Sequence, residues 1–277
     1  MKIALLDSGV GGLTVATELI KIMPEKEYIY YGDTLHLPYG PRPLKEVRDF
    51  TMKIINFLVN EKKADIVVIA CNTASAVALS LAKKNFIIPV YGTIDSASKT
   101  ASNISENKRV GIIGTEGTVN SGAYQDSLLE FDPTLSVFAE PCPRFVDFVE
   151  KGVLSGKKVI NYSQKCLEPL KKANIDSLIL GCTHFPYLID VIGEIMGQDV
   201  NLINPAVELA KAVRDNINKY NNENREINDK KNKIIKRVEN NKINFMVSDK
   251  NNISDLLWNS ELVNKKMISL SEVNIFN

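Results

Sequence analysis

The 277-residue sequence has no long hydrophobic run, almost no net charge and few cysteines. Its apolar stretches, such as residues 66–70, are far shorter than the roughly 20 residues that span a bilayer. The formal net charge of +1 gives no broad attraction to nucleic acid or to an anionic membrane. Asp7 interrupts the apolar N-terminal residues, so no signal peptide is indicated. These absences predict a globular, cytoplasmic protein with no nucleic-acid partner and no membrane partner.

The four cysteines are Cys71, Cys142, Cys166 and Cys182, and no two of them form a CxxC pair. Such wide spacing indicates neither a disulfide framework nor a zinc ribbon, so we expect free thiols. Cys166 in a helical stretch and Cys142 between two prolines fit small buried hydrophobes. Cys71 and Cys182 differ from these two, because each ends an apolar run and begins a polar turn.

What the sequence does contain is a regular alternation of short β-rich runs with helical periodicity. That alternation is typical of parallel α/β units. Between residues 44 and 58 apolar positions recur at steps of three or four, so one helical face should pack on a sheet. We expect strands at residues 2–6, 28–31, 66–70, 90–91, 109–113, 135–139, 177–180 and 200–203.

The second half of this pattern reads as an internal repeat of the first. KIALLDSGVGG matches KRVGIIGTEGT, IVVIACNT matches SLILGCTH, and PVYGTIDSA matches DVNLINPAVEL, in that order. Repeats of this length indicate duplicated domains. Residues 219–242 are rich in Asn and Lys and have little to bury, so we interpret them as a solvated insertion. The apolar pattern returns at residues 243–247 and 253–257. We therefore predict a first α/β domain from residues 1–96 plus 208–277, and a second from residues 97–207.

The thiols of Cys71 and Cys182 occupy corresponding places in the two halves, 111 residues apart. Open parallel sheets bind ligands beyond the carboxyl ends of their strands, where both thiols are expected. A helix predicted after each turn would favour anions there and lower a thiol pKa. Paired thiols on opposite walls could remove a proton from one face of a carbon and return one to the other. The neighbouring side chains that offer hydrogen bonds are Asn72, Thr73, Thr183 and His184.

Two glycine-rich loops are further candidates for ligand contacts. In DSGVGG, Asp7 and Ser8 would stand at the end of the first strand, to bind an ammonium group or to cap a helix. In GDTLHLPYGPRP, Tyr39 and the N–H of Gly40 could contact an anion, although a rigid surface loop is the simpler interpretation. Glu150 reads as an ordinary exposed carboxylate at a helix end.

Two other functions stay open at this point. A dinucleotide site is suggested by Gly9, Gly11 and Asp33, but Thr14 stands where the fingerprint requires a third glycine. A zinc site from Cys71, Cys182 and His184 lacks the usual spacing of four ligands, so we expect no metal.

Four segments in this order, DSGVGGLTV, GDTLHLPYG, ACNTAS and GCTHFP, resemble the glutamate racemases, which are cofactor-independent amino-acid racemases. The resemblance runs from Lys2 to about Arg214. It implies two similar, doubly wound α/β domains with mostly parallel sheets, related by pseudo-two-fold symmetry, with the substrate in the cleft between them. It also implies glutamate as the small-molecule partner, no cofactor, and D-glutamate supply for peptidoglycan. Aspartate racemases share the paired thiols but typically carry an acidic residue where His184 stands.

Carried onto matching positions, the resemblance implies that Cys71 and Cys182 are the acid/base catalysts, acting on D-glutamate and L-glutamate respectively. It gives assisting roles to Asp7 and His184, and a similar role to Glu150. We also expect a homodimer, although no sequence feature sets the oligomeric state. The substrate-binding residues implied are Asp7, Ser8, Tyr39, Gly40, Asn72, Thr73, Thr183 and His184.

Overall fold

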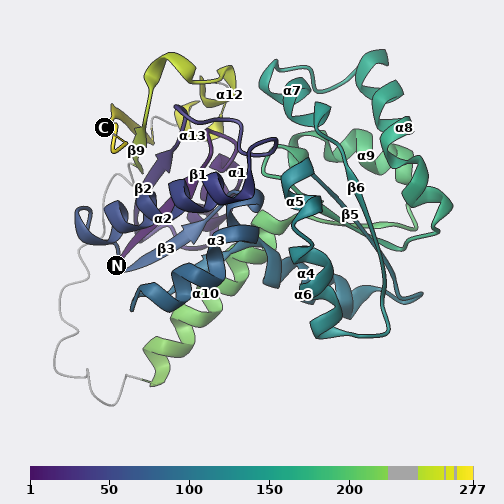
Figure 1. Cartoon of the computed structure of the whole chain (residues 1–277), viewed down its shortest axis with the longest axis horizontal. Coiled ribbons are helices and arrows are strands. Elements are labelled where there is room, and N and C mark those ends of the chain that lie inside the picture. Colours follow the sequence, from purple (N-terminus) through teal and green to yellow (C-terminus); the bar gives the residue numbers. More distant parts are fainter. Residues whose placement is uncertain (224–242, 259, 265–266, 277) are drawn as a thin grey trace.

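The computed structural model describes residues 1–223, 243–258, 260–264 and 267–276. Within these residues, parallel strands form two sheets, which lie side by side with helices around them (Figure 1). The first sheet has the strand order β10-β9-β2-β1-β3-β4. Its strands are β1 (Lys2–Asp7), β2 (Glu27–Gly32), β3 (Ile66–Ile69), β4 (Val90–Gly92), β9 (Ile243–Val247) and β10 (Ile268–Glu272).

The second sheet repeats the inner part of the first. Its order is β6-β5-β7-β8, and its strands are β5 (Arg109–Gly114), β6 (Ser136–Pro141), β7 (Ser177–Gly181) and β8 (Asn201–Ile203). Strands β6, β5, β7 and β8 thus take the places of β2, β1, β3 and β4, with parallel pairing throughout. The predicted duplication and the predicted α/β class with parallel sheets are both confirmed.

Alternating side chains divide the first sheet into two apolar faces. Ile3 and Leu5 face α1 (Leu13–Ile22) and α10 (Pro205–Glu223), whereas Ala4 and Leu6 face α2 (Leu44–Asn60) and α3 (Asn72–Asn85). Successive side chains of a strand point to opposite faces, so a strand covered on both sides must be apolar throughout. The predicted helical face is confirmed, because its members Val47, Thr51, Ile54 and Leu58 are all fully buried in α2.

The second sheet is covered in the same way. Helices α4 (Thr93–Ile104) and α6 (Ala123–Phe131) pack on one face, and α8 (Lys157–Lys172) and α9 (Ile189–Met196) cover the other. Two short helices, α5 (Glu116–Asn120) and α7 (Arg144–Glu150), come after the carboxyl ends of β5 and β6 and face the first domain (Figure 1). The domain boundaries at residues 96 and 208 stay a prediction, but β9 and β10 do return to the first sheet as expected.

The expectation of four free thiols is wrong. Cys142 and Cys166 form a disulfide, while Cys71 and Cys182 are free and buried. Cys142 comes directly after β6, and α8, which carries Cys166, packs beside that strand, so the two Cα atoms lie 6.1 Å apart. This distance suits a disulfide. Packing between distant elements creates the pair, and a separation of 24 residues gives no local signal of it.

The remaining expectations concern the last part of the chain and membrane-spanning helices. The sequence pattern missed β10, and the 253–257 segment contains the short helix α12 (Asp255–Trp258). Of the Asn- and Lys-rich segment, residues 219–223 form the end of α10, and the insertion predicted for the remainder lies outside the described residues. Among the described helices, none is both long and apolar enough to cross a bilayer.

Candidate active site

Both free thiols line one cavity between the two sheets. Cys71 comes two residues after β3 and Cys182 comes directly after β7, so equivalent strands of the two domains deliver them. The two sulfurs also influence each other electrostatically, since a negative charge on Cys182 raises the pKa of Cys71. Most of the predicted site residues line this cavity, namely Ser8, Tyr39, Gly40, Cys71, Asn72, Thr73, Cys182, Thr183 and His184.

The Cys71 thiol stands at the N-terminus of a long helix. Cys71 is the residue before α3, and the N–H groups of Thr73 and Ala74 lower its pKa, as the sequence predicts. Burial and the charge of Asp7 act in the opposite direction and dominate, raising the pKa of Cys71 to about 12. The helix thus lowers this pKa as predicted, but burial and Asp7 outweigh that contribution, so the thiol is protonated at neutral pH.

The Cys182 thiol has a histidine beside it. Its Sγ lies 3.7 Å from Nδ1 of His184, and Nε2 of His184 is hydrogen-bonded to Glu150 at the end of α7. Burial lowers the pKa of His184, but Cys182 and Glu150 outweigh burial and raise that pKa to about 10. At neutral pH, His184 is therefore a buried imidazolium whose Nδ1 lies beside the Cys182 sulfur. The helix expected after this turn is only the 3-10 helix Phe185–Leu188, and α9 begins at Ile189.

Glu150 is thus tied to the site rather than free at a helix end. Burial raises its pKa, but the hydrogen bond and charge of His184 more than compensate and leave the pKa below its usual range. Sequence patterns read this carboxylate as ordinary, because only the packing of α7 against the Phe185–Leu188 turn brings it to His184. The resemblance was the one signal that pointed to it.

Asp7 lies just behind the cavity and uses its two oxygens differently. Oδ2 accepts hydrogen bonds from the N–H groups of Gly9 and Gly12, which holds the loop before α1. Oδ1 is buried without a hydrogen-bond partner among the described residues. Burial raises the pKa of Asp7, and the charge of His184 partly offsets this effect. Asp7 therefore holds the loop before α1 but is not the predicted helix cap, because the N-cap residue is Gly12 and no side chain caps α1.

Two glycines let the domains approach closely around the site. A Cβ added to Gly11 would lie 2.5 Å from Cε1 of His184 and 2.7 Å from Oγ1 of Thr183. A Cβ added to Gly40 would lie 2.7 Å from Cβ of Thr115, and the Gly40 carbonyl accepts a hydrogen bond from the Gly117 N–H. Each glycine belongs to the first domain and each neighbour to the second. The first-domain loops therefore meet the second domain with no room for a side chain.

Three threonine hydroxyls form a cluster that sequence reasoning did not identify. Oγ1 atoms of Thr73, Thr115 and Thr118 lie 3.0 Å from one another, and all three residues line the cavity. Thr115 directly follows β5 and is the N-cap of α5, which contains Thr118, and this segment corresponds in the repeat to the DSGVGG loop after β1. That correspondence is the signal that could have identified them.

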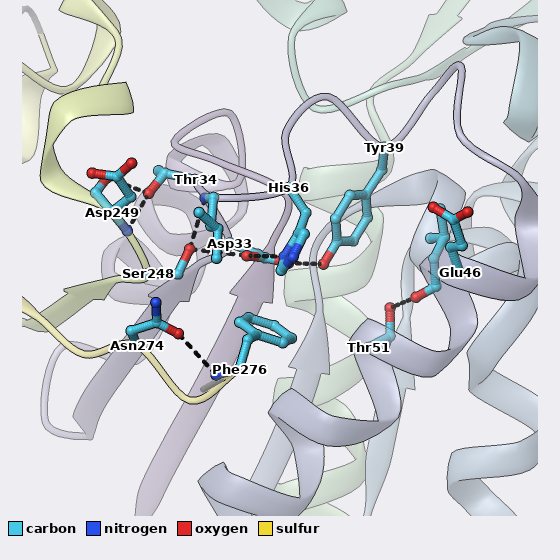
Figure 2. A network of polar contacts seen from close by, with 12 residues as sticks. Asp33, Thr34, His36, Tyr39, Glu46, Thr51, Ser248, Asp249, Asn274 and Phe276 are labelled. Carbon is cyan, nitrogen blue, oxygen red and sulfur yellow. Dashed lines mark hydrogen bonds and ion pairs between the residues drawn. The ribbon is translucent and has the colours of Figure 1, made fainter.

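The loop that carries Tyr39 and Gly40 is fixed by Asp33 (Figure 2). The Tyr39 hydroxyl donates to Asp33 at 2.7 Å, Ser248 donates to the same carboxylate at 2.9 Å, and His36 Nδ1 lies 2.9 Å away. The Tyr39 hydroxyl therefore donates its one proton to Asp33 and cannot donate it to a ligand at the same time. The Gly40 N–H has no acceptor among the described residues. An anion at this loop would be bound by main-chain donors.

The same contacts remove the basis of the dinucleotide interpretation. Asp33 is fully buried and already has three partners, so it cannot contact a ribose. The N–H groups of Gly9 and Gly12, which would face a phosphate, donate to Asp7. In the described part of the chain, no three His, Cys, Asp or Glu side chains are grouped as metal ligands.

Comparison with known proteins places this geometry in a family. The model of the Asp/Glu/Hydantoin racemase family matches residues 14–213. A glutamate racemase of Corynebacterium glutamicum is 48% identical over 211 residues, which is 76% of this chain and 77% of that protein. One from Exiguobacterium sibiricum is 46% identical over 211 residues, covering 76% of this chain and 78% of that protein.

Solved structures give the same result for the whole fold. A glutamate racemase isoform of Bacillus anthracis has a TM-score of 0.84 at 33% identity, covering 98% of this chain and 96% of its own. The Francisella tularensis glutamate racemase, solved in complex with D-glutamate, has a TM-score of 0.81 at 29% identity, covering 99% and 98%. The predicted resemblance is confirmed, and the chain belongs to the Asp/Glu/Hydantoin racemase family.

Proposed function

We propose that this protein is an isomerase that interconverts L- and D-glutamate without a cofactor. One observation carries the proposal: two free thiols, delivered by equivalent strands of two similar domains, line a single cavity. A racemase needs an acid/base group on each side of the α-carbon. The duplicated fold supplies one such group on each wall.

In the proposed reaction a cysteine thiolate removes the α-proton, so the C–H bond breaks and its electron pair stays on carbon. The thiol on the opposite wall then donates its proton to that carbanion from the other face. The first cysteine ends as a thiol and the second as a thiolate, so the reverse reaction starts from the product state. We assign L-glutamate to Cys182, whose thiolate the His184 imidazolium would stabilise, and D-glutamate to Cys71.

Binding donors and acceptors surround these thiols. The side chains of Asn72, Thr73 and Thr183 and the N–H of Gly40 can donate to the substrate carboxylates. Ser8 and the unpartnered Oδ1 of Asp7 can accept from the substrate ammonium. An ammonium near Asp7 would offset the negative charge that raises the pKa of Cys71, and so would assist ionisation of that thiol. We propose that Glu150 keeps His184 protonated through its hydrogen bond and its negative charge.

The relatives support the choice of glutamate. The Corynebacterium and Exiguobacterium proteins are named glutamate racemases at 46–48% identity, and the Francisella protein holds D-glutamate in its crystal structure. With that substrate, the product D-glutamate would serve peptidoglycan synthesis, in the cytoplasm. We further propose that the protein acts as a homodimer, which sedimentation equilibrium of the purified protein would test.

The direct test is to follow L-glutamate by circular dichroism with protein freed of added cofactors. We expect the signal to decay to zero, as the equilibrium mixture of enantiomers requires, and L-aspartate to turn over far more slowly. Activity that appears only with pyridoxal phosphate would contradict the proposal. Faster turnover of aspartate would assign the site to that substrate instead.

A further inference from the structure

Tyr124 connects the two domains directly behind the cysteines. It lies near the start of α6 in the second domain, and its side chain is 1% exposed. Its hydroxyl donates to Oδ1 of Asn72 at 2.6 Å. Asn72 belongs to the first domain, comes directly after Cys71 and lines the cavity. A single buried hydrogen bond therefore links α6 to the residue beside one catalytic thiol.

This hydrogen bond decides which end of the Asn72 carboxamide is free. Burial keeps the pKa of Tyr124 well above its usual value, so the phenol remains a donor at neutral pH. The amide oxygen takes that proton, and the amide nitrogen has no acceptor among the described residues. The orientation of an amide is set by its hydrogen-bond network. Here the network leaves the two N–H donors of Asn72 for the cavity.

The orientation of the Asn72 carboxamide decides whether it attracts or repels a bound carboxylate. A carboxamide that presents N–H groups complements a carboxylate, because an ionised carboxylate only accepts hydrogen bonds. The same side chain rotated by half a turn would place its oxygen against that carboxylate. Burying two acceptors against each other leaves both unsatisfied, which costs more than the loss of one hydrogen bond.

Packing holds the Tyr124 hydroxyl in place. The ring lies against the strands of the second sheet, where a Cβ added to Gly181 would lie 3.1 Å from Cε2 of Tyr124 and 2.8 Å from the Ile113 carbonyl oxygen. Gly181 directly precedes Cys182. The ring thus touches the backbone beside one thiol while the hydroxyl contacts the residue beside the other. This arrangement leaves the phenol little freedom to turn away from Asn72.

We propose that Tyr124 is a positioning residue of the substrate site, which keeps the Asn72 carboxamide turned with its nitrogen toward the bound carboxylate. The proposal rests on the proposed function for its substrate. Tyr124 acts through Asn72, so the effect of removing its hydroxyl on substrate binding must depend on the presence of Asn72.

The test is the variant Tyr124→Phe, which keeps the ring and removes only the hydroxyl. We expect KM for both glutamate enantiomers to rise about tenfold with kcat within about twofold, as for a lost interaction made equally before and during reaction. In an Asn72→Ala background, Tyr124→Phe should change KM by less than about twofold, because coupled residues are not additive. An equal rise in KM with and without Asn72, or none in either, would overturn the proposal.

A matched control separates positioning from general loss of a buried hydroxyl. Tyr28 is also buried, and its hydroxyl donates to the carbonyls of Leu19 and Met23 at the end of α1. Tyr28→Phe should lower the melting temperature to a similar extent and leave KM unchanged. A similar KM increase in this control would contradict a specific role for Tyr124.

A measurement without substrate keeps this inference separate from the proposed function. With ¹⁵N-labelled asparagine, the side-chain NH2 signals of Asn72 are those lost in Asn72→Ala. We expect these signals to shift or broaden in Tyr124→Phe, because the amide can then rotate. Unchanged signals would refute the positioning role even if wild-type protein racemises glutamate. A wild-type protein that does not racemise glutamate would refute the function alone.

Discussion

The two thiols of the cavity have the same origin in the fold but different surroundings. Cys71 stands at the N-terminus of α3, with the Asp7 carboxyl group nearby and a pKa raised to about 12. Cys182 precedes a short 3-10 turn and has the His184 imidazolium 3.7 Å from its sulfur. Duplication therefore explains where the thiols are, and local residues explain why the charged groups beside them differ.

Because of this difference, the thiol that removes the α-proton has different charged groups beside it in the two directions of the proposed reaction. On the Cys182 wall the His184 imidazolium, hydrogen-bonded to Glu150, already lies beside the sulfur before substrate binds. On the Cys71 wall the offsetting cation has to be brought by the substrate, whose ammonium would meet the free oxygen of Asp7. A symmetric fold thus carries an asymmetric distribution of charge.

The largest expected effect comes from removing either thiol. Cys71→Ser and Cys182→Ser should each lower the racemisation rate by at least about 10³-fold, because an acid/base catalyst is worth 10²–10⁴-fold and a serine hydroxyl ionises far less readily. The remaining thiol should still exchange the α-proton of the enantiomer that it faces. We expect Cys182→Ser to exchange D-glutamate and Cys71→Ser to exchange L-glutamate, measured by mass spectrometry in D2O. Exchange of the same enantiomer by both variants would remove the distinction between the walls.

The next largest effect on kcat is expected from a substitution that disturbs the contact between the DSGVGG loop and the Cys182 wall. In Gly11→Ala the new methyl would lie 2.5 Å from His184 and 2.7 Å from Thr183, so those side chains must move. A displacement of this order can cost about 10²-fold in kcat. Gly9→Ala is the matched control, since its methyl would meet only Leu37 at 3.7 Å. Equal kcat values in the two variants would show that the close approach does not matter.

Removal of the carboxylate behind His184 should have a moderate effect that depends on pH. In Glu150→Gln the pKa of His184 should fall from about 10 toward 6.5, because one of the groups that raise it loses its charge. The basic limb of the pH–rate profile should then move to lower pH. The chain has only two histidines, so NMR titration can resolve His184 once His36→Asn identifies the other signal. An unchanged His184 titration would contradict the proposed role of Glu150.

The pKa shifts of His184 and Glu150 also determine how the stability of the fold should vary with pH. The raised pKa of His184 contributes stability that is full below pH 6.5 and is lost as pH rises through about 10. The lowered pKa of Glu150 contributes stability that is present above pH 4.5 and is lost as pH falls through its lowered value. Denaturant unfolding of wild type and Glu150→Gln should therefore differ most between pH 4.5 and 6.5. A difference that does not vary with pH would exclude this linkage.

The smallest effect on catalysis is expected from the other two cysteines. The double variant Cys142→Ser/Cys166→Ser should racemise glutamate at nearly the wild-type rate, because neither residue lines the cavity. Its free energy of unfolding should fall by roughly 3 kcal/mol, as for other disulfides that close loops of similar size. Loss of activity at a temperature where the variant is folded would show that Cys142 and Cys166 contribute to catalysis.

The sequence predicts the framework of this molecule better than its contacts. Strands such as β1 and β3 are found because buried parallel strands are continuously apolar, and the repeat is found because duplicated halves keep matching residues. The placement of Cys71 and Cys182 derives from both features. By contrast, β10 lies at the edge of its sheet and is not fully buried at any position, so its sequence has no comparable signal.

Contacts between distant elements could not be predicted in the same way. The Cys142–Cys166 disulfide, the link from Glu150 to His184 and the bond from Tyr124 to Asn72 each join residues at least 24 positions apart. Local patterns carry no information on such pairs. The helix expected directly after Cys182 is also absent, because the likeness of the two cysteine turns does not extend to the Phe185–Leu188 segment.

The central claim is that opposite thiols take and give the proton. Its most direct test is the isotope content of D-glutamate formed from L-glutamate in D2O at low conversion. We expect the first product molecules to carry α-deuterium while the remaining L-glutamate is unlabelled, since the donating thiol has exchanged with solvent. Product that keeps the original α-proton, or deuterium that enters substrate and product equally, would indicate a single base and contradict the account.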